Sequence, residues 1–234
     1  MQIFYAPDLT GDLYKLDEKE SRHCIKALRM TKGTPVKLID GKGSLFEGVI
    51  NNPDPRGCII SITGIVSDFE KRNYKLHLAI SPLKNPDRLE WFIEKSVEIG
   101  VDEITPMICH NTEKTGFKEE RINNLIISAM KQSLKASKTI LNPVSRFEEV
   151  ISKPFAGKRM IAHCNGSIER KKISDICFSN DDALILIGPE GDFSEAEIRD
   201  ATGNGFISVH LGRSRLRTET AGVAACHSVY FINQ

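Results

Sequence analysis

The sequence predicts an α/β protein with a mainly parallel sheet, preceded by a small β-rich domain. Two patterns carry this prediction. Between residues 72 and 234, short apolar runs alternate with helical segments, which is the order of βαβ units in a parallel sheet. Residues 1–71 instead hold several short strands separated by turns, which is typical of a small barrel. We therefore expect two domains, 1–71 and 72–234.

Length and composition limit the class of protein. The 234 residues, 40% of them hydrophobic, can bury one sizeable core and a second smaller one. No apolar run is long enough to cross a bilayer and no signal peptide precedes the first strand, so we expect a cytoplasmic protein. The six cysteines are scattered, without a Cys-x-x-Cys pair, and predict reduced thiols and no metal site.

The first domain opens with strand-like Ile3–Tyr5. Residues 36–50 form two strands around an Asp40-Gly41 turn, and Cys58–Val66 forms a third strand. Between the first strand and this hairpin we expect one helix over 21–30.

Two basic blocks stand out in a chain whose net charge is +1. Residues 21–39 and 121–147 each hold five Lys or Arg and no acid. Helical spacing places Arg22, Lys26 and Arg29 on one face in the first block, and Lys131, Lys135 and Lys138 on one face in the second. A solvated helix surface is the ordinary explanation. Contact with RNA phosphate is favoured for the first block because no acid balances its charge.

The second domain begins with a predicted strand over 75–81. Asn85 then caps a helix whose first residue is proline and which Gly100 ends, and a strand over 103–108 completes a βαβ unit. Trp91 on this helix is expected in the core rather than as a platform for a base.

The C-terminal part holds two strand-loop-helix units. A strand over 184–187 leads into the loop Gly188–Phe193, and Ser194 with Glu197 forms a capping box for the next helix. A strand over 208–211 leads into the basic loop 212–217, with Thr218 as the predicted N-cap of the last helix. Loops at the carboxyl ends of parallel strands are preferred ligand sites, so both loops are candidates.

The residues of these two loops resemble a known pair of signatures. Ile-Gly-Pro-Glu-Gly followed by Phe-Ser, and then Leu-Gly with Leu-Arg-Thr-Glu-Thr-Ala, are similar to the motifs of SPOUT methyltransferases, and more narrowly of the ribosomal RNA small-subunit methyltransferase E family. The resemblance implies a PUA-like or OB-like barrel and a C-terminal trefoil knot within about residues 184–234. It implies S-adenosylmethionine as the cofactor and N3 of a uridine in 16S ribosomal RNA as the target. A homodimer is predicted because the basic N-terminal face and the methyl site lie in different domains. The candidate dimer surface, as in the family, is the terminal helix with its small residues Ala221, Gly222, Ala224 and Ala225.

The resemblance also implies roles for individual residues. Those expected at the cofactor are His163, Ile187, Gly188, Pro189, Glu190, Gly191, Leu211, Gly212, Leu216, Arg217 and Thr218, with Glu190 and Arg217 also expected in catalysis. Those expected at RNA are Arg22, His23, Lys26, Arg29, Lys84, Arg88, Lys131 and Lys135. Two positions depart from the family pattern. Asp192 replaces a common glycine, and Leu134-Lys135 replaces a usual Gly-Arg.

Several alternatives stay open. Glu190 is either a contact to cofactor or uridine, where it could serve as proton acceptor, or a carboxylate that ties its loop to a nearby arginine. His163 either approaches the cofactor or is a hydrogen-bonded structural histidine. A nicotinamide-dependent enzyme is disfavoured because no Gly-x-Gly-x-x-Gly follows an early strand. A SPOUT enzyme acting on transfer RNA and a non-catalytic RNA-binding assembly factor remain as alternatives.

Overall fold

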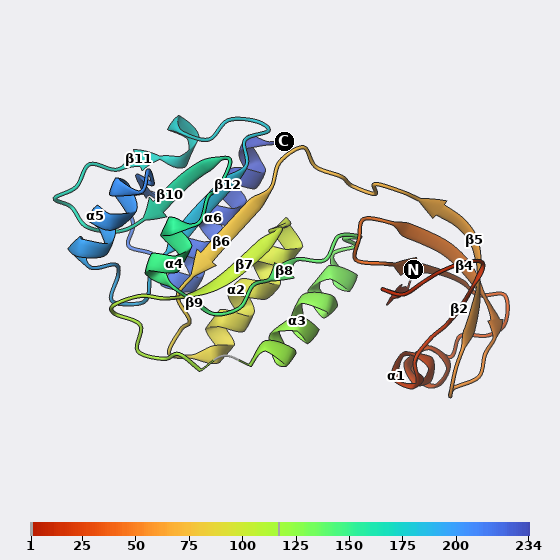
Figure 1. Ribbon diagram of the computed structural model, residues 1–234. Coiled ribbons are helices and arrows are strands. Elements are labelled where there is room, and N and C mark those ends of the chain that lie inside the picture. Colours follow the sequence, from red (N-terminus) through yellow and green to blue (C-terminus); the bar gives the residue numbers. More distant parts are fainter. Residues whose placement is uncertain (1, 117) are drawn as a thin grey trace. The chain divides into compact units, whose positions relative to one another are not determined.

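The computed structural model describes residues 2–116 and 118–234. The chain forms two compact units (Figure 1). The first contains Met1–Lys71 together with Met130–Lys138, and the second contains Arg72–Ala129 together with Thr139–Gln234. Each unit is described by itself.

A curled sheet forms the first unit. Its strands run in the order β1-β3-β4-β5-β2, with β1 parallel to β3 and the other neighbours antiparallel. Bulges in the β4–β5 pairing bend the sheet around a core that includes Phe4, Leu38 and Ile60. The strands are β1 (Ile3–Tyr5), β2 (Leu13–Lys15), β3 (Pro35–Ile39), β4 (Leu45–Asn52) and β5 (Ile59–Val66).

The helix expected over residues 21–30 is wrong in its bounds. The chain forms α1 (Glu18–Arg22), capped by the Asp17 carboxylate, and then a π-helical turn, η1 (His23–Ala27). Arg29 lies beyond the helical segment with φ of 54°. Arg29 therefore does not continue the helical face that Arg22 and Lys26 were expected to share with it.

The second basic block is also not one helix. α3 (Glu119–Gln132) includes Lys131 and ends before Leu134, whose φ is 59°. The chain after the helix binds the curled sheet through backbone hydrogen bonds, from Lys138 N to Gly41 O and from Gly43 N to Ala136 O. These contacts override the helical spacing of the lysines, so the predicted shared face of Lys131, Lys135 and Lys138 is wrong.

A parallel sheet is the centre of the second unit, as the sequence predicted. Its order is β11-β13-β10-β12-β6-β7-β8, with β9 also paired to β7. All these pairings are parallel. The strands are β6 (Leu76–Ile80), β7 (Glu103–Ile108), β8 (Ile140–Leu141), β9 (Ser145–Arg146), β10 (Lys158–Ala162), β11 (Lys171–Lys172), β12 (Ala183–Ile187) and β13 (Ile207–His210).

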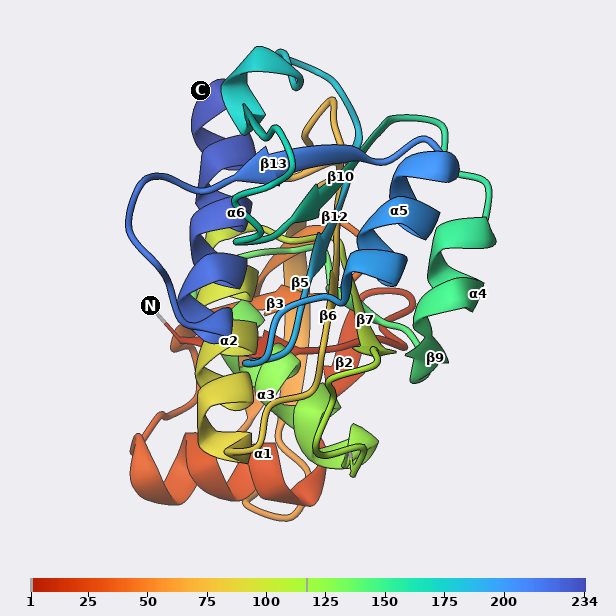
Figure 2. The same cartoon turned by 90° about the vertical axis from the view of Figure 1, so that its left-hand side faces the viewer.

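Helices cover both faces of this sheet. Figure 2 shows α2 (Pro86–Ile99) and α6 (Thr218–Ile232) on one face, and α4 (Phe147–Ser152) and α5 (Glu195–Gly203) on the other. A short 3-10 turn, η2 (Ile173–Asp175), follows β11. Every residue of β12 is buried, as its unbroken apolar run predicts.

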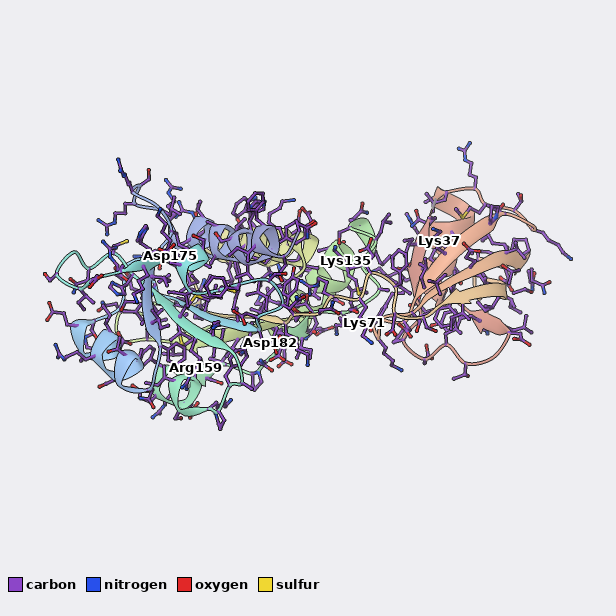
Figure 3. All side chains as sticks on the ribbon, turned by 90° about the horizontal axis from the view of Figure 1, so that it is seen from above. Lys37, Lys71, Lys135, Arg159, Asp175 and Asp182 are labelled. Atoms are coloured by element: carbon purple, nitrogen blue, oxygen red, sulfur yellow. The ribbon has the colours of Figure 1, made fainter. Side chains whose placement is uncertain are left out.

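Polar and charged side chains connect the amino ends of neighbouring strands inside this sheet. The Asp182 carboxylate, directly before β12, accepts a hydrogen bond from Lys75 N at 2.7 Å, and the Arg159 guanidinium on β10 lies over the Phe206 ring. Figure 3 labels Asp182 and Arg159. These contacts hold neighbouring strands together at their amino ends, opposite the carboxyl ends that carry the candidate ligand loops.

The local signals of α2 are confirmed. The Asn85 side chain accepts from Asp87 N, Pro86 is the first helical residue, and Gly100 ends the helix with φ of 116°. α6 crosses α2 closely, since a Cβ added at Gly222 would lie 2.4 Å from the Phe92 ring. The placement of Trp91 in the core is wrong, because its side chain faces outward and is 43% exposed.

Candidate active site

The loop Gly188–Phe193 leaves the carboxyl end of β12, which lies between β10 and β6. Asp192 N donates to Pro189 O at 2.9 Å, which closes a turn. Ser194 then caps α5 in the predicted capping box with Glu197. A Cβ at Gly188 would lie 3.0 Å from the Phe193 ring, so a larger residue here would press on that ring.

Asp192 links this loop to the segment that follows the neighbouring strand β10. Its φ is 63°, a left-handed conformation that aspartate tolerates better than most residues. Its carboxylate accepts hydrogen bonds from Phe193 N at 2.8 Å and from Cys164 N at 2.7 Å. The second bond reaches the segment that follows β10. Aspartate at this position therefore tightens the loop.

Two further side chains hold the same loop from the other direction. Asn111, after β7, donates through its amide to the carbonyls of Gly191 and Asp192. Glu190 accepts from the backbone N–H of Lys84, after β6, at 3.1 Å. Glu190 thus ties its loop to a neighbouring loop, but its partner is a backbone group and not the arginine expected.

The second loop follows β13 and spans Leu211–Arg217. Gly212 has φ of 116°, and an added Cβ there would meet nothing within 4 Å. Arg217 is the N-cap residue of α6 and Thr218 is its first helical residue, so the predicted cap is wrong by one position. Thr218 and Glu219 are buried at the start of the helix.

The two loops meet at one cavity of about 810 Å³. This volume suits a small-molecule site. The cavity brings together most residues predicted at the cofactor, with Gly191 the exception. The predicted residues that line it are His163, Ile187, Gly188, Pro189, Glu190, Leu211, Gly212, Leu216, Arg217 and Thr218.

Sequence reasoning missed other lining residues. Besides Asp192, which it noted only as a departure, these include Cys164, Arg170, Arg213, Arg215 and Glu219. The alternating arginines of the basic loop were the available signal for two of them. Arg170 had no such signal, since it reaches the cavity from the segment between β10 and β11.

His163 lines this cavity and has an unpaired imidazole. Its side chain is buried, with 4% exposed, and within the described residues neither ring nitrogen has a hydrogen-bond partner. Burial lowers the pKa of His163 below its ordinary value, although the nearby Asp192 carboxylate opposes the shift. The expectation of a hydrogen-bonded structural histidine is therefore wrong. The lowered pKa disfavours the charged form of a ring whose two nitrogens are buried and unpaired.

The residues predicted at RNA are divided between the two units. Arg88 lines the cavity and faces Glu219 at 3.7 Å. Lys84 forms an ion pair with Glu113 at 2.6 Å. Arg22, His23, Lys26, Arg29, Lys131 and Lys135 belong to the first unit.

Acids from outside the basic blocks balance part of their charge. Glu18 pairs with Arg22, Glu20 with Lys131 at 2.7 Å, and Glu70 with Lys135 at 3.5 Å. The premise that no acid neutralises the first block is therefore wrong for Arg22. His23, Lys26 and Arg29 remain exposed.

No cluster of three or more potential metal ligands occurs among the described residues. In the same part of the chain, no helix combines the length and the apolar character that crossing a membrane requires.

Two family descriptions match successive parts of the chain. Residues 16–63 match an RNA methyltransferase PUA domain, and residues 70–230 match an RNA methyltransferase domain. The second match covers more than half of the chain.

Individual relatives agree with these matches. A ribosomal RNA small subunit methyltransferase E from Mesomycoplasma hyopneumoniae is 32% identical over 69% of this chain and 71% of its own. The crystal structure of a probable rRNA-methyltransferase from Porphyromonas gingivalis is 41% identical, with a TM-score of 0.93 and coverage of 100% of this chain and 98% of that chain.

A third relative was solved with a ligand. The ribosomal RNA small subunit methyltransferase E from Neisseria gonorrhoeae, bound to S-adenosyl methionine, is 26% identical, with a TM-score of 0.90 and coverage of 100% of this chain and 98% of that chain. Both the sequence signatures and the whole-chain likeness point to the same group. The chain belongs to the ribosomal RNA small subunit methyltransferase E family.

Proposed function

We propose that this protein transfers the methyl group of S-adenosylmethionine to N3 of a specific uridine in the 16S RNA of the small ribosomal subunit. The observation that carries the proposal is the meeting of the loops Gly188–Phe193 and Leu211–Arg217 at one cavity. The family supports it, since its members are named for small-subunit ribosomal RNA and one was solved with this cofactor.

The cavity residues fit such a cofactor. Leu211 and Leu216 offer apolar surface for the two faces of an adenine ring, and both line the cavity. Gly212 leaves open space where any other residue would place a Cβ. The buried, unpaired nitrogens of His163 provide a polar group that awaits a ligand. Backbone groups of Ile187, Gly188 and Pro189 complete the wall.

The demands on the protein are modest. When bound, S-adenosylmethionine supplies a methyl group that its sulfonium has already activated. The chain must therefore hold donor and acceptor in line, exclude water and take up the proton that uracil N3 carries. The loop Gly188–Phe193 is held from three neighbouring segments, at Lys84, Asn111 and Cys164, which suits a positioning role.

Glu190 and Arg217 are the proposed catalytic residues. Both line the cavity and both are exposed there. The Glu190 carboxylate uses one hydrogen bond to Lys84 N, which leaves capacity to accept the N3 proton. Arg217, at the start of α6, is placed to orient an anionic group of the cofactor or of the target nucleotide.

Binding of RNA is assigned to both proposed domains, residues 1–71 and 72–234. His23, Lys26 and Arg29 of the first are exposed, and Lys26 and Arg29 can meet phosphate directly. Arg22, Lys84, Arg88, Lys131 and Lys135 would have to exchange their present carboxylate partners for phosphate. The proposed location of the protein is the cytoplasm, where its ribosomal substrate is assembled.

We also propose a homodimer and a knotted C-terminus within about residues 184–234. The outward face of α6 includes His227 and Phe231, whose rings stack 6.1 Å apart, and Phe231 is 71% exposed. An exposed aromatic of this kind suits contact with a second copy. Sedimentation of the active protein as a monomer would contradict the dimer, and a crystallographic chain trace without a threaded loop would contradict the knot.

The decisive experiment uses small ribosomal subunits from a strain that lacks this enzyme. The purified protein and labelled S-adenosylmethionine should produce one modified uridine, located by mass spectrometry of the RNA. Methylation of transfer RNA instead would show that the substrate is transfer RNA and would contradict the proposed ribosomal target. Absence of saturable heat on calorimetric titration with the cofactor would contradict the methyltransferase activity and favour a non-catalytic RNA-binding protein.

A Glu190→Gln variant tests the proton acceptor. We expect kcat to fall about 100-fold, within the usual range for a general base, while the dissociation constant for the cofactor changes little. If Glu190 only ties its loop to Lys84, glutamine retains an acceptor oxygen and kcat stays near that of the wild type. The two roles therefore predict different results for one variant.

A further inference from the structure

The charged side chains around the cavity do not balance. The cations that line it are Arg88, Arg170, Arg213, Arg215 and Arg217, and the anions are Glu190, Asp192 and Glu219. Five arginines against three carboxylates leave an excess of two positive charges among the described lining residues. This excess is local, because the whole chain carries a net charge of only +1.

Each of these carboxylates already has at least one partner within the protein. Glu219 faces Arg88, Asp192 accepts two backbone hydrogen bonds, and Glu190 accepts one. No ion pair in the described part of the chain involves Arg213 or Arg215, and both are exposed. Their charge is therefore available to a ligand.

Two other exposed arginines of the same unit, Arg121 and Arg199, differ from Arg213 and Arg215 because each has a carboxylate partner. Arg121 pairs with Glu90 at 2.6 Å, and Arg199 pairs with Glu195 at 3.7 Å. An arginine at the rim of a cavity that has no neighbouring carboxylate attracts an anionic ligand.

The proposed cofactor does not account for this excess. S-adenosylmethionine carries a sulfonium and an ammonium against one carboxylate, so its own net charge is positive. Its carboxylate needs one cationic partner at most. The remaining arginines repel the positively charged cofactor slightly unless a second, anionic ligand binds in the same cavity. A polyanion whose target base must reach the methyl group meets this requirement.

We propose that Arg213 and Arg215 bind RNA phosphates that flank the target nucleotide, so that the loop Leu211–Arg217 holds the cofactor on one side and the RNA strand on the other. The inference rests on the proposed function and adds two positioning residues to it. Arginine suits the role because its planar fork can bind two phosphate oxygens at once.

The test measures the salt dependence of RNA binding. The probe is deproteinised small-subunit ribosomal RNA from a strain without the enzyme, titrated in fluorescence-detected binding between about 50 and 200 mM KCl. Each single-stranded phosphate contact contributes about 0.7 to the slope of log affinity against log salt. The double variant Arg213→Gln/Arg215→Gln should lower that slope by about 1.4.

Two variants serve as matched controls. Arg199→Gln removes an exposed arginine of α5 that already has a carboxylate partner and lies outside the cavity lining, so the slope should not change. Arg213→Lys/Arg215→Lys keeps the charge and should retain the slope, while losing the bidentate contact that positions the strand. In that variant we expect a lower kcat with RNA binding largely preserved.

Calorimetry with S-adenosylmethionine separates the two ligands. The double glutamine variant should bind the cofactor within about twofold of the wild type. An unchanged salt slope would overturn the inference, and so would a loss of cofactor affinity large enough to assign both arginines to the donor. Failure of the wild-type protein to bind the cofactor would instead overturn the proposed function, and the salt slopes would still decide the role of the two arginines.

Discussion

The two loops that line the cavity are built in opposite ways. Gly188–Phe193 is fastened to three neighbouring segments by hydrogen bonds that involve Glu190, Asp192 and Asn111. Leu211–Arg217 has local hydrogen bonds, from Gly212 N to the His210 ring and from Ala221 N to Arg217 O, and presents exposed arginines. We call the first loop the fixed wall and the second the adaptable wall; under the proposed function, the fixed wall positions the small donor and the adaptable wall meets the RNA strand.

The largest effect is expected from disturbing the fixed wall. In Gly188→Val, the side chain would collide with the Phe193 ring and with Phe193 N, which lie 3.0 and 3.2 Å from an ideal Cβ. Displacement of the loop should weaken cofactor binding about 100-fold, or about 2.7 kcal/mol, by calorimetry. Gly203→Ala is the control, since an added Cβ at Gly203 meets nothing within 4 Å. Equal affinities for both variants would contradict a fixed wall.

A smaller effect is expected at Asp192. Asp192→Ala removes the acceptor for Phe193 N and Cys164 N and places a less tolerant residue at φ of 63°. We expect cofactor affinity to fall about tenfold, since hydrogen bonds to charged groups contribute about 1.5–3 kcal/mol. Asp192→Asn retains an acceptor and tolerates the backbone, so it should lose less. An alanine variant as tight as the wild type would show that the carboxylate does not hold the loop.

The adaptable wall should respond more weakly. Leu216→Ala removes one proposed apolar contact with adenine from a side chain that is partly exposed in the free protein. The cofactor should bind about fivefold more weakly, while the thermal midpoint stays within about 2 °C of the wild type. A large drop in that midpoint would mean that Leu216 serves the core rather than the ligand.

The smallest effect is expected from the pH dependence of His163. Burial lowers its pKa in the folded protein, so the unfolded chain binds more protons once the pH falls below about 6.5. This histidine therefore reduces stability as the pH falls from neutral toward 5. His163→Asn should lose less stability than the wild type over that interval, by urea unfolding. Parallel curves would rule out a neutral, buried imidazole at this site.

Local signals predicted much of the fold. The α2 helix followed its Asn85 cap, its Pro86 start and its Gly100 end, because each acts on the backbone within one turn. The same holds for the capping box of α5. The predicted knot and homodimer depend on relations between distant segments and stay predictions.

Long-range contacts defeated the other helical predictions. Lys131 and Lys135 have the spacing of one helix face, yet the chain leaves α3 at Leu134 and binds the curled sheet near Gly41 and Gly43. The partners of Lys131 and Lys135 are Glu20 and Glu70, which are far away in sequence. Charge counting within a window cannot detect such neutralisation.

The site was predictable where backbone chemistry dictated residue type. Glycine at 188 and 212 marks a close contact and a left-handed turn. The role of His163 was not predictable, since the absence of a hydrogen-bond partner depends on everything that surrounds the ring. Arg170 was also missed, because its place follows from the path of the chain after β10.

The close crossing of α2 and α6 at Gly222 links the packing of these helices to the position of the cavity wall. Gly222 lies one turn along α6 from Thr218, which lines the cavity, and it contacts Phe92 instead of any ligand. A single methyl group added there would collide with the Phe92 ring, and relief of that contact would move α6, whose first turn lines the cavity. Substitutions at the crossing of α2 and α6 can therefore alter the activity of this enzyme without contacting its substrates.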